Sequence, residues 1–273
     1  MFELIGQMLS YPFLVRALIV GVLVSLCAAL LGVTLVLKRY SMIGDGLSHV
    51  GFGALAIAAA LGTAPLAVCI PVVSLAAVLL LRLSESARVK GDAAIALISS
   101  GSLAVGVLVV SLAGGMNTDV NNYMFGSILS LSRGDTVLSV ALAVIVLLLY
   151  LLFFNRLFAV TFDETFARAT GTKAGFYNLL VALLTAVTVV LGMRMMGALL
   201  ISSLIIFPAL SAMRVCRTFR RTAVTAAVLS VVCFLVGTVA SFAWELPTGA
   251  TVVAVNILAF AVCAVSGIVK RKG

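Results

Sequence analysis

The sequence contains very little charge. Only 10% of its 273 residues are Asp, Glu, Lys or Arg, whereas 63% are hydrophobic, and the mean hydropathy is +1.30. A soluble globular domain has about 25% charged and about 45–50% apolar residues. The composition therefore excludes an ordinary soluble domain and predicts a chain that lies in a membrane.

Acidic residues are especially scarce. The chain has 18 Lys and Arg residues against 9 Asp and Glu residues, which gives a net charge of +9. An excess of this size also occurs in nucleic-acid-binding proteins, but basic residues at the ends of membrane spans explain it more simply. We therefore expect the lipid bilayer, and no nucleic acid, as a partner.

Two kinds of motif are missing. The five cysteines lie singly in apolar runs without CxxC spacing, which argues against a disulfide framework or a cysteine metal cage. There is also no GxxxxGK[ST] motif, so we expect no nucleotide site in this chain and no permanently bound cofactor.

Long apolar runs fill most of the sequence. A helix needs about 20 apolar residues to cross a bilayer core of about 30 Å, and lipid leaves unpaired backbone groups without partners. We therefore predict an all-α, polytopic membrane helix bundle in which residues 1–273 form one transmembrane domain. The predicted spans are 12–37, 43–62, 65–81, 92–113, 136–154, 175–193, 197–213, 222–243 and 249–269.

The basic residues predict the orientation of these spans. If the N-terminus is outside and the C-terminus inside, the inner connections hold fifteen of the eighteen Lys and Arg residues. The outer side then holds only Arg16, Arg133 and Arg194. Cytoplasmic loops of membrane proteins carry such an excess of Lys and Arg. The sequence therefore predicts an N-out, C-in bundle.

Two connections between spans are long. On the outer side, residues 114–135 mix turn formers with an amphipathic piece and predict a short surface helix. On the inner side, residues 155–174 predict a compact helix that Thr161 or Asp163 caps and Gly171 ends. This inner helix can lie flat on lipid or dock in a groove of a partner, and its pattern alone does not decide between them. The residues that share its apolar face are Phe162, Phe166 and Ala169.

The stretch SMIGDGLSHV (41–50) places a carboxylate and the chain's one histidine in a predicted span. Asp45 and His49 are four residues apart and therefore share one face of a helix. At 1.5 Å per residue, His49 lies about 15 Å from Arg39, close to the middle of the bilayer. An ionised Asp at that depth costs about 2.5–3.5 kcal/mol, and such residues usually line a wet cavity or an ion path.

This pair has both structural and functional interpretations. The helix dipole can stabilise Asp45, a neighbouring helix can bind His49, or the two can simply pair with each other. As ligands, a carboxylate and an imidazole suit zinc, manganese or ferrous iron. Because a tetrahedral metal takes four ligands, a two-fold homodimer would complete the set.

Two further features concern the packing of the helices. GFGALAIAAALG (51–62) consists almost wholly of small residues, which allow close helix approach and predict an interior helix. Pro208 lies inside an apolar run and removes one backbone donor, so it predicts a kink. That kink is a candidate gate or hinge.

Four motifs follow one another along the chain: KRYSMIGDGLSHVGFG (38–53), NNYMFGSILSLSRGD (121–135), FDETFARATG (162–171) and MGALLISSLIIFPALSA (196–212). In this order they resemble the integral-membrane permeases of bacterial ABC importers for zinc and manganese. The resemblance covers nearly the whole chain and implies a multi-pass protein of the bacterial inner membrane. It also implies a permease homodimer, two cytoplasmic ATPase subunits that bind ATP, and an extracytoplasmic metal-binding protein.

The resemblance assigns roles to particular residues. It places the metal-binding carboxylate and histidine on Asp45 and His49, and it makes residues 162–171 the helix that couples to the ATPase. Manganese-type members often have SH-x-x-LPG where this chain has SHVGFGA, which favours zinc, then manganese, with iron possible. The implied coupling residues are Phe162, Asp163, Glu164, Phe166, Ala167, Arg168 and Gly171.

The sequence leaves other functions open. A permease for an organic metal chelate or a vitamin-like ligand would need a wide cavity but not Asp45 with His49. An intramembrane hydrolase would need a nucleophile, for which SSGSLAVG (99–106) offers only serines near glycine. A channel or secondary carrier would work without an ATPase.

Overall fold

The structure, a computed structural model, describes residues 10–85, 91–113 and 133–272. These residues form helices joined by short turns, with no strand among them. The predicted surface helix within 114–135 lies, up to residue 132, outside the described residues. The helices are α2 (Pro12–Leu37), α3 (Ile43–Ala60), α4 (Pro65–Glu85), α5 (Gly91–Leu112), α7 (Arg133–Leu152), α8 (Phe154–Phe162), α9 (Glu164–Ala169), α10 (Ala174–Met196), α11 (Ala198–Val215), α12 (Phe219–Trp244) and α13 (Thr248–Lys272).

Within the described parts of the chain, nine helices are long and apolar enough to cross a membrane. All but α8 and α9 belong to this group, and each corresponds to one predicted span. The predicted spans 175–193 and 197–213 are separated by only a few residues. Gly197 ends α10 between them with φ of 86°, a value that suits glycine. The all-helical, nine-span prediction is confirmed.

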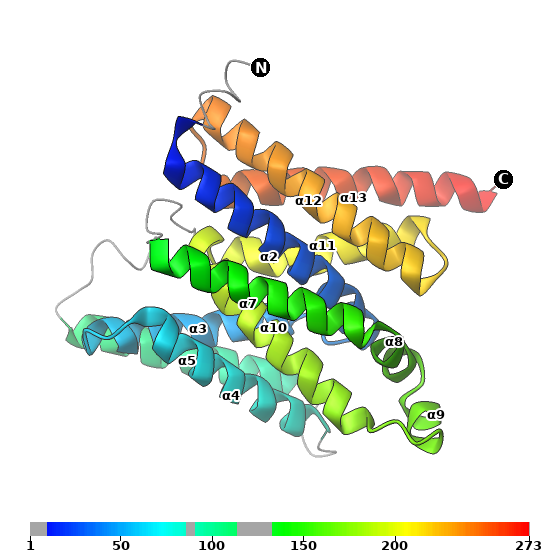
Figure 1. The fold of residues 1–273 in the computed structure, drawn as a ribbon, viewed down its shortest axis with the longest axis horizontal. Coiled ribbons are helices and arrows are strands. Elements are labelled where there is room, and N and C mark those ends of the chain that lie inside the picture. The colour runs from blue at the N-terminus through cyan, green and yellow to red at the C-terminus, as the bar shows by residue number, and fades with distance from the viewer. Residues whose placement is uncertain (1–9, 86–90, 114–132, 273) are drawn as a thin grey trace.

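The spans alternate in direction along the chain (Figure 1). The start of α2 and the end of α13 consequently lie at opposite ends of the bundle, as an odd number of crossings requires. The short helices α8 and α9 lie at the end where α13 finishes, and we call this the α9 end. The described basic residues of the connections gather at that end: Lys38, Arg39, Arg82, Arg156, Arg168, Lys173, Arg214, Arg217, Arg220 and Arg221.

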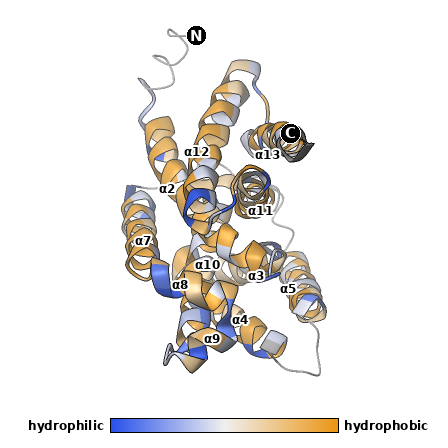
Figure 2. Ribbon diagram, turned by 90° about the vertical axis from the view of Figure 1, so that its right-hand side faces the viewer, coloured by the Kyte–Doolittle hydropathy of each residue, from blue (hydrophilic) through white to orange (hydrophobic). Residues whose placement is uncertain are grey.

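The centre of the bundle consists of α2, α3 and α10. In each of these helices about 70% of the most apolar stretch is buried (67%, 72% and 72%), against 17% in α5 and α13. Seen end-on, α10 and α3 lie in the middle, and apolar residues dominate the outward-facing helices as well (Figure 2). Apolar side chains on both the inside and the outside of a bundle are expected where lipid replaces water.

Small residues set the closest helix contacts. Gly32 of α2 lies directly against the backbone of Ile205 in α11, so that a methyl group there would collide with the Ile205 carbonyl oxygen. Gly53 and Gly106 likewise bring α3 and α5 together, and Gly51 to Ala56 are all buried. This confirms that the small-residue helix is an interior one.

We expect Gly32→Val to lower the thermal stability of the detergent-solubilised protein by about 5 °C, since overpacking a core contact costs about 1–3 kcal/mol. The control is Gly101→Ala, because nothing lies within 4 Å of the position of its added methyl group. Size-exclusion chromatography after heating measures the difference. Equal melting of the two variants would show that the α2–α11 contact is not tight.

Candidate transport site and coupling segment

Asp45 and His49 pair on one face of α3, as predicted from their spacing. The His49 Nε2 atom lies 3.6 Å from Asp45 Oδ2. The Ser202 hydroxyl of α11 lies 3.4 Å from Asp45 Oδ1 and also donates to the Ala198 carbonyl at 3.0 Å. The polar group therefore has three members. Ser202 lies in the 196–212 motif, but no local pattern places it beside Asp45, 157 positions away.

Two glycines explain how the pair is held. Gly44 and Gly46 flank Asp45, and each gives room to a neighbouring helix. A methyl group on Gly44 would lie 2.7 Å from Ile205 of α11, and one on Gly46 would lie 2.7 Å from Ile95 of α5. Both helices therefore close on α3 to either side of Asp45, and α3 lies between α11 and α5 in the end-on view (Figure 2).

The pair occupies the uncovered part of an otherwise buried helix. From Ile43 to Ala56, every residue of α3 is buried except Asp45 and His49. Their side chains remain 43% and 27% exposed, respectively. The neighbouring helices thus enclose the apolar faces of α3 and leave its carboxylate and imidazole open at the surface of the single chain.

The depth of His49 differs somewhat from the expectation. The estimate of about 15 Å from Arg39 treated residues 40–42 as helix, whereas α3 begins at Ile43 after a turn. His49 is the seventh of 18 residues in α3 and lies about 4 Å short of its middle. The pair therefore lies well inside the span, nearer to the α9 end.

One chain supplies only part of a metal coordination shell. Among the described residues no three His, Cys, Asp or Glu side chains lie close enough to hold a metal ion. Asp45 and His49 provide two metal-binding side chains that face the same direction. Any cation held there needs further ligands from outside this chain, such as a second copy.

The second candidate segment, 162–171, forms a capped helix. Asp163 accepts a hydrogen bond from the Phe166 amide at 2.8 Å and so caps α9, while Gly171, with φ of 82°, follows its end. Both predicted boundaries are confirmed. The preceding residues form a separate helix, α8, whereas the sequence predicted a single helix in this connection.

The predicted apolar face of Phe162, Phe166 and Ala169 is wrong, because Phe162 ends α8 and Ala169 is exposed. Ala167 is buried against Val160 and Ala174, which attaches α9 to α8 and α10. Phe162 and Phe166 are 60% and 64% exposed. Two exposed phenylalanines at one end of the bundle form an apolar surface suited to contact with lipid or a partner.

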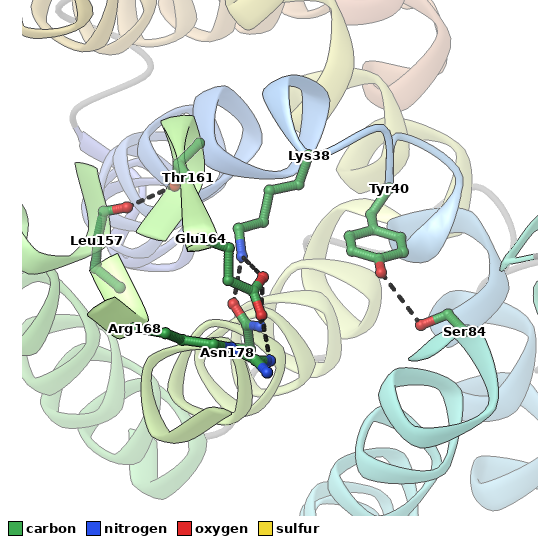
Figure 3. A network of polar contacts seen from close by, with 8 residues as sticks. All are labelled: Lys38, Tyr40, Ser84, Leu157, Thr161, Glu164, Arg168 and Asn178. Carbon is green, nitrogen blue, oxygen red and sulfur yellow. Dashed lines mark hydrogen bonds and ion pairs between the residues drawn. The ribbon is translucent and has the colours of Figure 1, made fainter. Parts of the chain in front are cut away.

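Glu164 joins α9 to the rest of the bundle (Figure 3). Its carboxylate accepts from Arg168 at 2.6 Å and from the Asn178 amide at 3.2 Å, and it lies 3.6 Å from Lys38 Nζ. Lys38 also donates to the Asn178 side-chain carbonyl. No local sequence pattern marks this network, because Lys38 and Asn178 are 140 positions apart in the chain.

At the end of the bundle away from α9, Arg194 of α10 forms a bidentate ion pair with Asp135 of α7, with hydrogen bonds of 2.9 and 3.2 Å. Pro208 lies inside α11, which continues as one helix from Ala198 to Val215. Its role as a gate or hinge stays a prediction.

Comparison with known proteins agrees with this arrangement. The sequence profile of the ABC 3 transport family matches residues 10–267. The chain belongs to the ABC 3 transport family. It is therefore a transport component and a multi-pass protein of the bacterial inner membrane, as the motifs implied.

Several proteins similar to this ABC 3 chain have been named or solved. The manganese import system permease protein ScaB of Streptococcus gordonii is 27% identical, over 95% of this chain and 93% of that protein. The chelated iron transport system membrane protein YfeD of Yersinia pestis is 30% identical, over 99% and 91%. A chain in the structure of PsaBC from Streptococcus pneumoniae with a Fab has a TM-score of 0.85 and 26% identity, over 96% and 94%.

The network around Glu164 predicts a pH dependence. Burial raises the pKa of this carboxyl, but hydrogen bonds from Asn178 and Arg168 and the charge of Lys38 outweigh it, so the pKa is lowered from 4.5. A group with a lowered pKa stabilises the fold above its unfolded pKa, and this contribution is lost as the pH falls through the folded value.

We therefore expect α9 of this ABC 3 protein to loosen below pH 4.5 and to be held at neutral pH. A nitroxide on Thr165→Cys, an exposed position of α9, should gain mobility on acidification. In the Glu164→Gln background it should be equally mobile at pH 7 and after acidification. A nitroxide that responds identically in both backgrounds would show that Glu164 does not hold α9.

Proposed function

We propose that this chain is the permease subunit of an ABC importer that moves a divalent transition metal ion into the cell. Zinc is the first candidate, followed by manganese, with iron possible. The observation that carries this proposal is the Asp45–His49 pair, left open on an otherwise buried helix. Ionisable residues inside membrane spans usually mark the path of an ion.

The ligand chemistry supports a transition metal. An imidazole with a carboxylate suits zinc, manganese or ferrous iron, whereas calcium and magnesium prefer a shell of oxygens. Ser202 would orient Asp45 in this site, since the hydroxyl lies beside Oδ1 while His49 lies beside Oδ2. The cation is cargo and does not stay bound. Transport therefore requires a complete coordination shell only while the ion crosses the membrane.

A second permease copy would complete the site. Because one chain offers two ligands facing outward, two copies around a two-fold axis offer two carboxylates and two imidazoles. Burial against a second copy would also remove Asp45 and His49 from lipid, where an ionised carboxylate is unfavourable. We therefore propose a homodimer with its axis near α3.

Energy would enter at the α9 end. The concentration of basic residues there supports a cytoplasmic location, with the N-terminus outside and the C-terminus inside. The exposed Phe162 and Phe166 would then dock in one of two cytoplasmic ATPase subunits. ATP hydrolysis would move α9 and open the Asp45–His49 site alternately to each side, and an extracytoplasmic metal-binding protein would deliver the ion.

The names of the relatives include both manganese and chelated iron, so a second candidate is a permease for a metal chelate. Competition between free and chelated metal in uptake by the reconstituted complex distinguishes the two. Uptake of free zinc that a chelator abolishes supports the first proposal. Uptake that requires the chelate supports the second.

Replacing the pair should abolish transport. We expect Asp45→Asn and His49→Gln each to lower metal uptake in proteoliposomes by more than about tenfold, since even the partners of metal ligands matter by about 10–100-fold. Asp92→Asn, which removes an acid from the first turn of neighbouring α5, is the matched control. Wild-type uptake by the two pair variants would refute the proposed ion path.

The proposed ATPase contact gives a separate prediction. Phe166→Ala should weaken binding of the ATPase subunit by about tenfold, which corresponds to the loss of one aromatic anchor. Phe176→Ala removes another exposed phenylalanine, on α10, and should leave the affinity unchanged. Surface plasmon resonance on the permease in nanodiscs measures both. Equal affinity of the Phe166 variant and the wild type would place the docking surface elsewhere.

A further inference from the structure

The connection between α2 and α3 is fastened to the coupling segment at one point. Lys38 follows the last residue of α2, and its side chain is only 12% exposed. A lysine is rarely buried to this extent without a partner. Its partners are Glu164 of α9 and Asn178 of α10, which also bind each other (Figure 3). Three elements thus meet at this ammonium group.

The turn that follows Lys38 is short and held in place. Arg39 adopts φ of 62°, the Tyr40 amide donates to the Leu35 carbonyl at 2.8 Å, and the Ile43 amide donates to the Tyr40 carbonyl at 3.1 Å. The Ser84 hydroxyl of α4 donates to the Tyr40 hydroxyl at 3.4 Å (Figure 3). There is no glycine between Lys38 and Ile43 that would let this turn flex freely.

Asp45 follows this turn directly, in the first turn of α3. A displacement of Lys38 must therefore move the start of α3, since the intervening residues have little freedom. On the other side, α9 has few buried attachments: Ala167 packs on α8 and α10, and Glu164 provides the polar link. Movement of α9 would thus be transmitted mainly through Glu164.

From these contacts we propose that Lys38, Glu164 and Asn178 are positioning residues that transmit the movement of α9 to the Asp45–His49 pair. This inference rests on the proposed function, because it concerns the path from the ATPase to the cargo site. The three residues touch neither cargo nor nucleotide. They act by fixing the start of α3 relative to α9, so that the pair is displaced when the coupling segment moves.

The test uses the full complex of permease, ATPase and binding protein in liposomes, with ATP hydrolysis and metal uptake measured together. Lys38→Met should keep the ATPase bound and hydrolysing, while the number of metal ions moved per ATP falls by about tenfold. Glu164→Gln should lower the same ratio.

Arg156→Gln is the matched control. Arg156 lies at the same end and bonds to Thr172 at 3.4 Å, but it does not join α2 to α9. It should keep the wild-type number of ions per ATP. A wild-type ratio in Lys38→Met and Glu164→Gln would overturn the proposal.

Hydrogen exchange supplies a second readout that does not depend on transport. ATP should change deuterium uptake at residues 39–49 in the wild-type complex, and Lys38→Met should lose that change while keeping the response at 162–171. A retained change at 39–49 would refute the link. If the wild-type complex moves no metal, the proposed function fails, and the exchange comparison still decides on the link.

Discussion

The bilayer offers no hydrogen-bond partner, and this constraint governs the whole molecule. Backbone groups must be satisfied within each span, so the described chain is built from helices. Side chains are subject to the same constraint, so a carboxylate that is left uncovered in a span is unfavourable and usually has a function. Among the residues of α3 from Ile43 to Ala56, only Asp45 and His49 are left open. The fold thus encloses α3 from Ile43 to Ala56 and leaves only its polar pair open.

Small residues make that arrangement possible. Gly44 and Gly46 let α11 and α5 approach α3 beside Asp45, and Gly53 permits the close contact with α5. Larger side chains at these positions would separate the helices and widen the opening around the pair. The same crowding means that α3 cannot move alone, so a displacement at its start affects the position of Asp45 and His49. The connection through Lys38 and Glu164 begins at that start.

Much of this could be predicted from the sequence, because hydrophobic length and helical spacing are local properties. The spans were predicted to within a few residues, for example 197–213 against Ala198–Val215, and the stacking of Asp45 on His49 follows from a spacing of four. Contacts between distant segments could not be predicted. Ser202 meets Asp45 across 157 positions and Lys38 meets Asn178 across 140, and no local pattern marks either.

The most direct test of the account is X-ray absorption spectroscopy of zinc bound to the purified permease in nanodiscs, without the ATPase and the metal-binding protein. The account predicts a first shell of nitrogen and oxygen at about 2.0–2.1 Å, with the scattering of two imidazoles and no sulfur. Because each chain has one histidine, two imidazoles require one from each of two copies. A shell containing sulfur, or one without any imidazole, would contradict the central claim that Asp45 and His49 of paired permeases hold the ion.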